Sequence, residues 1–207
     1  MNRRDILKAT GAGMIASSLP AQAAPAWDKV KLDMAAKLME GWIADGRVQG
    51  ASILVSRGAS QQFARNFGTA KGSEPVFLLA SITKPMTAAV VMTLVDSGQL
   101  SLDDKVSKFF PAFTGEGRDT ITVRHLLTHT GGLPDMLGDD EMMRERHAPL
   151  SDYREGAIKA PLKFAPGTKY SYASMGILLS SEIAQKITGK PFADIMDERL
   201  FRPLGMS

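Results

Sequence analysis

The stretch Ser81-Ile82-Thr83-Lys84 follows the apolar run Val76-Phe77-Leu78-Leu79-Ala80 and opens a segment with the pattern of a helix. Residues three positions apart share one face of a helix, so we expect the Lys84 amine to reach the Ser81 hydroxyl. A serine hydroxyl is weakly nucleophilic until a base takes its proton, and a desolvated lysine with a lowered pKa can act without histidine. The spacing therefore predicts a serine nucleophile for acyl transfer.

A serine and a lysine at this spacing also occur together by chance, so the prediction depends on the surrounding residues. Pro85 lies in the first turn of the expected helix, where a missing N–H costs little, and Gly98 follows its end at Asp96. The positive end of such a helix favours an oxyanion near Ser81. The residues expected to form its apolar stripe are Ala88, Val91, Met92 and Val95, and Ala80 and Val90 are expected to add to a helix buried on most sides.

Composition limits the classes of function. The chain has 207 residues, of which 44% are hydrophobic, which is sufficient for one globular domain with a core. Its net charge of +3 arises largely near the N-terminus, so we expect no nucleic-acid partner. The absence of cysteine excludes disulfides, thiolate metal sites and cysteine nucleophiles. No motif indicates a cofactor, and the oligomeric state is left open.

The first 23 residues have the pattern of an export signal. Asn2-Arg3-Arg4-Asp5-Ile6-Leu7-Lys8 is typical of the twin-arginine type, a short apolar stretch follows, and Ala21-Gln22-Ala23 offers a cleavage site. The apolar stretch is too short for a membrane span. We therefore predict a periplasmic or secreted bacterial protein without a stable membrane anchor after cleavage. The alternative is an amphipathic N-terminal helix.

The remaining pattern predicts an α+β fold with an all-helical portion. A helix over 27–44 precedes two strands, 51–56 and 61–67, joined by a turn at 57–60. Short helices are expected at 122–128, 139–147 and 153–160. A longer amphipathic helix over 176–188 is closed by Gly189, and another begins at 191–200.

Five ordered segments resemble the serine β-lactamase-like family, which includes class C β-lactamases, D-alanyl-D-alanine carboxypeptidases and related esterases. The segments are Phe77–Pro85, Leu100–Val106, Thr122-Val123-Arg124-His125-Leu126-Leu127-Thr128-His129-Thr130-Gly131-Gly132-Leu133-Pro134, Pro166–Ser174 and Phe201–Met206. The resemblance runs from about Gly50 to Ser207. It implies a β-lactamase/transpeptidase-like fold in which helices flank an antiparallel sheet. Residues 24–207 would form part of this catalytic domain, with a helix and hairpin at 27–68 and a helical region at 81–207.

The resemblance also implies roles for individual residues. Ser81 would be acylated, Lys84 would take or share its proton, and Tyr172 would be the second proton carrier. Tyr170 is the rival tyrosine, although the family pattern favours Tyr172. The family commonly has Asn where this chain has Ser174, which implies a weaker substrate contact and a modest preference for simple esters. The substrate would be a small ester, a β-lactam or a D-Ala-D-Ala peptide.

The family usually continues beyond this point with a third motif, Lys-Thr-Gly or His-x-Gly, on a strand that supplies the second oxyanion N–H. The resemblance therefore implies that the chain is truncated, that the C-terminal sheet strands are missing, and that the activity of this form is an open question. The alternative is a non-catalytic binding or scaffold protein with a penicillin-recognising fold.

Other hydrolytic chemistries fit the sequence less well. No G-x-S-x-G occurs, so the nucleophile elbow of Ser–His–Asp hydrolases is absent. His125 and His129 have the spacing of a metal pair, but neither H-E-x-x-H nor a third ligand accompanies them, so we expect no metal. We instead expect His125 to pack, His129 to hydrogen-bond a loop, and His147 to be exposed.

Overall fold

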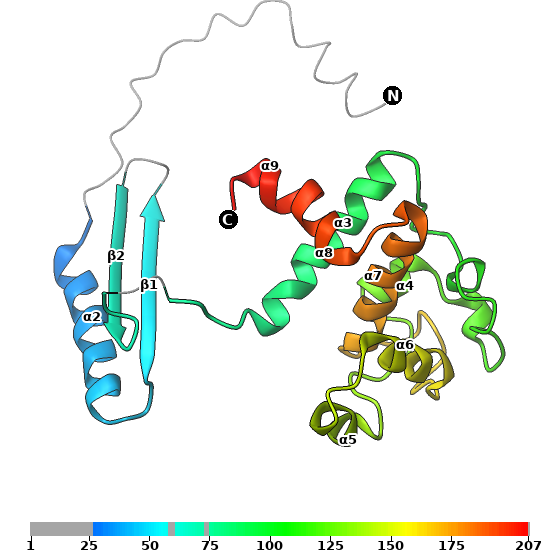
Figure 1. Cartoon of the computed structure of the whole chain (residues 1–207), viewed down its shortest axis with the longest axis horizontal. Helices are drawn as coiled ribbons and strands as arrows, with labels where there is room; N and C mark the ends of the chain where they lie inside the picture. Colours follow the sequence, from blue (N-terminus) through cyan, green and yellow to red (C-terminus); the bar gives the residue numbers. More distant parts are fainter. Residues whose placement is uncertain (1–26, 58–60, 73–74, 207) are drawn as a thin grey trace, which may run out of the picture. The chain divides into compact units, whose positions relative to one another are not determined.

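The computed structural model describes residues 27–57, 61–72 and 75–206, and the chain divides into two compact units between Phe77 and Leu78 (Figure 1). The predicted export signal at 1–23 and most of the predicted turn at 57–60 lie outside the described residues. The order of elements, a helix and a hairpin followed by helices, confirms the predicted α+β class.

The first unit contains one helix, α2 (Lys29–Ala44), and two strands, β1 (Gly50–Arg57) and β2 (Gln61–Gly68). The strands pair antiparallel, with Gly50 opposite Gly68, which confirms the predicted hairpin. Helix α2 begins where the Asp28 side chain accepts a hydrogen bond from the backbone N–H of Lys31, and it packs against β2. The apolar side chains Val30, Met34 and Leu38 of α2 are exposed.

The second unit is helical and is organised around α7 (Ser174–Thr188). Helix α7 contacts α3 (Thr83–Asp96), α4 (Val123–Leu127), α6 (Leu150–Lys159) and α8 (Phe192–Met196) (Figure 1). Its Leu179, Ile183 and Ala184 are fully buried, and this burial supplies much of the hydrophobic driving force that holds the helices together.

Helix α3 meets the core through a stripe that matches the predicted one only in part, because Val90 and Val91 are buried as expected. The buried residues are Thr87, Val90, Val91 and Leu94, a spacing that keeps them on the face towards α7. Met92 is 37% exposed, so its predicted place in the stripe is wrong. A local apolar pattern shows that the helix has a core side, but the direction of that side depends on where α7 lies.

The remaining elements are short. They are the 3₁₀ turns η1 (Ala80–Ile82), η2 (Val106–Lys108) and η3 (Arg118–Thr120), helix α5 (Asp140–Glu145), the π-helical turn η4 (Asp197–Phe201) and helix α9 (Arg202–Leu204). The helix predicted to begin at 191–200 is confirmed, since α8 begins at Phe192, and η4 and α9 extend it with a changed hydrogen-bond register that was not predicted. Within the described ranges, no helix has both the length and the apolar character needed to cross a bilayer.

Candidate active site

Ser81 lies in the 3₁₀ turn η1, and Lys84 lies in the first turn of α3. The Lys84 Nζ donates a hydrogen bond to the Ser81 Oγ over 3.2 Å, as the three-residue spacing predicts. Ala80, just before the serine, has a φ of 46°, in the left-handed region that a residue with a Cβ rarely adopts. The strained backbone of Ala80 therefore lies immediately before the candidate nucleophile.

Tyr172 joins this pair from a distant segment of the chain. The Lys84 Nζ lies 5.0 Å from the centroid of the Tyr172 ring. The side chains of Ser81, Lys84 and Tyr172 all line one cavity of about 350 Å³. Its lining residues are Ser81, Lys84, Pro85, Ala88, Leu127, His129, Tyr172 and Ile177. The structure thus brings together the hydroxyl, the amine and the phenol that the sequence singled out.

The environment of Tyr172 favours the ionised phenol. Hydrogen bonding to Ser81, and then hydrogen bonding to Lys84 and its positive charge, lower the pKa of the Tyr172 phenol below its ordinary value of 10.0. Burial and the negative charge of Asp135 act in the opposite direction and are outweighed. A phenol in this position is better able to accept a proton than a free tyrosine.

The rival tyrosine does not reach the cavity. Tyr170 is 67% exposed and meets the His129 ring edge-on, with 5.9 Å between the ring centroids. It is not among the lining residues, whereas Tyr172 is. Of the two tyrosines, only Tyr172 is placed to exchange a proton with Ser81 or Lys84.

Ser174, the predicted substrate contact, is the first residue of α7 and is held by Asp135. The Ser174 Oγ donates to the Asp135 Oδ1 over 2.6 Å, and the Ser174 backbone N–H donates to the same oxygen over 2.9 Å. Burial raises the pKa of Asp135, but these two hydrogen bonds and the charges of Lys84 and Lys163 outweigh burial, so the pKa lies below its ordinary value. The hydroxyl proton of Ser174 is therefore already engaged.

The Beta-lactamase family model matches residues 32–207, a range that includes every residue of this cavity. The chain belongs to the Beta-lactamase family. The resemblance inferred from the five sequence segments is confirmed. Family membership carries no further assignment of roles, so the roles of Ser81, Lys84, Tyr172 and Ser174 stay predictions supported by their placement.

Relatives in this family include several hydrolases. The chain is 32% identical over 182 residues to the esterase EstB of Burkholderia gladioli, covering 77% of this chain and 46% of the esterase. It is 32% identical over 167 residues to penicillin-binding protein 4* of Bacillus subtilis, covering 75% and 36%. A D-amino acid amidase from Ochrobactrum anthropi superposes with a TM-score of 0.69 at 26% identity, covering 83% and 49%. The chain spans less than half the length of these curated relatives.

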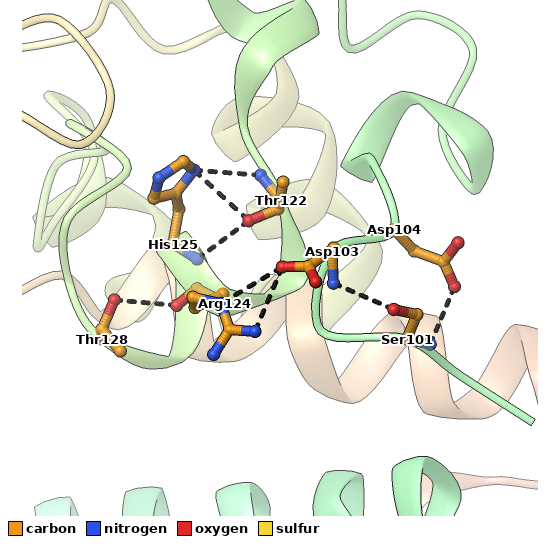
Figure 2. Close-up of polar contacts among 7 residues, drawn as sticks. All are labelled: Ser101, Asp103, Asp104, Thr122, Arg124, His125 and Thr128. Carbon is orange, nitrogen blue, oxygen red and sulfur yellow. Dashed lines mark hydrogen bonds and ion pairs between the residues drawn. The ribbon is translucent and has the colours of Figure 1, made fainter. Parts of the chain in front are cut away.

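The segment Leu100–Val106 and α4 are joined by a polar network (Figure 2), and α4 also carries Leu127, which lines the cavity. The Ser101 N–H donates to Asp104 over 2.9 Å, and Arg124 donates to the Asp103 carboxylate over 3.1 Å. His125 does more than pack, because its Nδ1 accepts from the Thr122 N–H over 3.2 Å while the Thr122 hydroxyl accepts from the His125 N–H. This reciprocal cap begins α4 and fixes the start of the segment that leads to His129.

His125 and His129 take part in different contacts, since His125 caps α4 and His129 lines the cavity. Burial, followed by the positive charges of Lys105 and Arg124, lowers the pKa of His125, which favours the neutral ring that the cap requires. His147 is exposed, as expected. Among the described residues, no group of three or more His, Cys, Asp or Glu side chains could hold a metal ion. Sequence reasoning missed the place of His129 in the cavity, although His129 belongs to the family signature.

Proposed function

We propose that this chain carries the nucleophile and the proton-transfer groups of a serine hydrolase that cleaves an ester or amide through a serine acyl-enzyme. The observation that carries the proposal is the convergence of Ser81, Lys84 and Tyr172 in one cavity, with the Lys84 Nζ 3.2 Å from the Ser81 Oγ and 5.0 Å from the Tyr172 ring centroid. Membership in the Beta-lactamase family, with an esterase and a penicillin-binding protein among the relatives, supports it.

The reaction would proceed in two halves. The Ser81 Oγ attacks the substrate carbonyl carbon while its proton passes to the coupled Lys84–Tyr172 pair. The carbonyl oxygen becomes an oxyanion, which the positive end of α3 and the Ser81 N–H stabilise. When the carbon–leaving-group bond breaks, the pair returns the proton to the leaving group. Water then attacks the acyl-serine, with the pair acting first as base and then as acid towards Ser81.

The substrate class that we favour is a short-chain ester. An Asn at position 174 would offer an amide group with a donor and an acceptor to the side chain of an acylamide substrate. Ser174 is shorter, and its hydroxyl proton is engaged by Asp135 at 2.6 Å. A simple ester has no acylamide side chain and therefore needs no hydrogen-bond partner at this position. A β-lactam or a D-amino-acid peptide is the competing substrate.

Covalent labelling tests the proposal directly. A fluorophosphonate probe should label the 207-residue chain on Ser81, with the site identified by peptide mass spectrometry. Ser81→Ala should abolish the label, whereas Ser52→Ala, which changes an exposed serine of β1, should leave it unchanged. Failure to label a chain whose circular dichroism is native would overturn the proposal in favour of a non-catalytic binding protein. Turnover of p-nitrophenyl acetate faster than nitrocefin supports the ester preference, and the reverse order contradicts it.

A further inference from the structure

His129 contacts the polypeptide on both sides of Tyr172. Its backbone carbonyl accepts a hydrogen bond from the Ser171 N–H over 3.0 Å, and its ring Nδ1 accepts one from the Ala173 N–H over 3.2 Å. Its ring also lies against the Tyr172 ring, with 4.8 Å between centroids and 35° between planes. One residue thus fixes the backbone before the tyrosine, the backbone after it, and one face of its ring.

The backbone of His129 makes these contacts possible. Its φ of 58° lies in the left-handed region, which costs energy for any residue with a Cβ. The cost persists only where surrounding contacts determine the conformation, and here the gain is a side chain turned towards the cavity that Tyr172 lines. Ala80, which precedes Ser81 in the chain, has the same kind of left-handed backbone as His129, which contacts the Tyr172 ring.

We propose that His129 is the positioning residue for Tyr172, and that it acts through the acceptor nitrogen Nδ1, which holds the Ala173 N–H. The inference rests on the proposed function, because it assigns a purpose to the placement of the phenol. An accepting Nδ1 means that the neutral ring carries its proton on Nε2. Loss of the acceptor leaves the Ala173 N–H without its partner and frees the segment that carries Tyr172.

Displacement of the phenol has a specific consequence. The low pKa of the Tyr172 phenol depends first on its contact with Ser81 and then on Lys84, while Asp135 opposes them. A phenol that moves away from these two groups ionises closer to the ordinary tyrosine value of about 10. It also transfers protons from a poorer geometry, and a misplacement of about 1 Å costs on the order of 10²-fold in rate.

The experiment compares His129→Ala with His129→Asn. Asparagine tolerates the left-handed region, and its Oδ1 can accept from the Ala173 N–H where Nδ1 does. The chain has only three tyrosines, so ultraviolet titration can detect one whose phenol ionises at a lower pH than an ordinary tyrosine. We call this step of the titration the early phase. Its loss in Tyr172→Phe would assign it to Tyr172. We expect the early phase in the wild type and in His129→Asn, and its shift towards the ordinary value in His129→Ala.

The kinetic expectation follows the same order. For p-nitrophenyl acetate, His129→Ala should lower kcat about 10²-fold with little change in KM, and His129→Asn should restore most of it. If circular dichroism shows that His129→Ala does not fold, His129→Phe is used in its place. Phenylalanine keeps an aromatic ring but has no nitrogen that can accept a hydrogen bond from the Ala173 N–H. The proposal is overturned if kcat falls equally in His129→Asn and in the variant without the acceptor. It is also overturned if the early phase does not shift in a folded variant without the acceptor.

The two proposals fail separately. An early tyrosinate phase that responds to His129 in a chain that fluorophosphonate does not label would retain the positioning role and reject the acyl-enzyme. A chain that is labelled, but whose early phase is the same in the wild type and in the His129 variants, would retain the acyl-enzyme and reject the positioning role.

Discussion

Asp135 and Lys84 act on the Tyr172 phenol with opposite signs. Hydrogen bonding to Ser81 and to Lys84 lowers the pKa of Tyr172, and the Asp135 carboxylate raises it. Lys84 in turn helps to hold the pKa of Asp135 low, so the carboxylate stays charged at neutral pH. The three groups therefore form one coupled system, in which the charge of Asp135 can be changed without touching the nucleophile.

Removal of that charge should make Tyr172 a stronger acid. Asp135→Asn keeps an oxygen that can accept from the Ser174 N–H but has no negative charge, so the pKa of Tyr172 should fall further. If the phenolate is the base, acylation by p-nitrophenyl acetate rises with pH through that pKa, because the protonated phenol cannot accept a proton. The midpoint of the pH–rate profile should lie below about 10 in the wild type and lower still in the variant.

Asp139→Asn is the matched control, because Asp139 lies in the same stretch of chain but is not among the groups that shift the pKa of Tyr172. Its pH–rate profile should overlay that of the wild type. A midpoint that rises in Asp135→Asn, or does not move, would contradict the coupling.

At the scale of single residues, the sequence predicts the reacting groups better than the groups that hold them. Ser81 and Lys84 are three positions apart and can be paired from spacing alone, while Tyr172 needed the family pattern. His129 and Asp135 act on residues 44 and 39 positions further along the chain. Nothing in their local pattern distinguishes a loop histidine from one that holds the Tyr172 segment, because that role depends on how two distant segments fold together.

At the scale of elements, the segment after α4 contains two adjacent glycines, Gly131 and Gly132, whose surroundings differ. Gly132 has a φ of 81°, and a Cβ at this position would lie 2.4 Å from the Phe164 carbonyl oxygen. Its own carbonyl accepts from the Lys163 N–H over 2.8 Å. Gly131 needs no left-handed backbone, and its Cβ would meet its nearest neighbour at 3.5 Å. Only the second glycine is required by the fold.

Gly132→Ala should therefore lower the free energy of unfolding by at least about 2 kcal/mol, from left-handed strain and a clash with backbone. Gly131→Ala, the matched control, should change it by less than about 1 kcal/mol. Urea unfolding followed by circular dichroism measures both midpoints. Equal effects in the two variants would show that the backbone at Gly132 is not the constraint described.

Element boundaries depart from the sequence pattern where long-range contacts decide them. Helix α7 begins at Ser174, two residues before the predicted Gly176, because the Asp135 carboxylate accepts the Ser174 N–H from another segment. The π-helical turn η4 contains Arg199, which donates to Thr93 and Gln99 about a hundred positions away. Apolar periodicity carries no information about either contact.

At the scale of the whole molecule, the absence of cysteine fits export in a folded state. A chain that needs no disulfide can fold in a reducing compartment before it leaves. We propose that residues 1–23 are an export signal of the twin-arginine type, read from Arg3, Arg4 and the site Ala21-Gln22-Ala23. Most of the net positive charge would leave with the signal.

This proposal predicts a sequence-specific requirement for arginine. In bacterial cells that produce the 207-residue chain, periplasmic protein should begin at Ala24, as shown by N-terminal sequencing. The double variant Arg3→Lys, Arg4→Lys keeps the charge but loses both guanidinium groups, so unprocessed chain should accumulate in the cytoplasm. Lys8→Arg, which leaves the pair intact, should be processed as the wild type is. Normal processing of the double variant would reject the twin-arginine route, and a wild-type chain that keeps Met1 in the cytoplasm would reject export altogether.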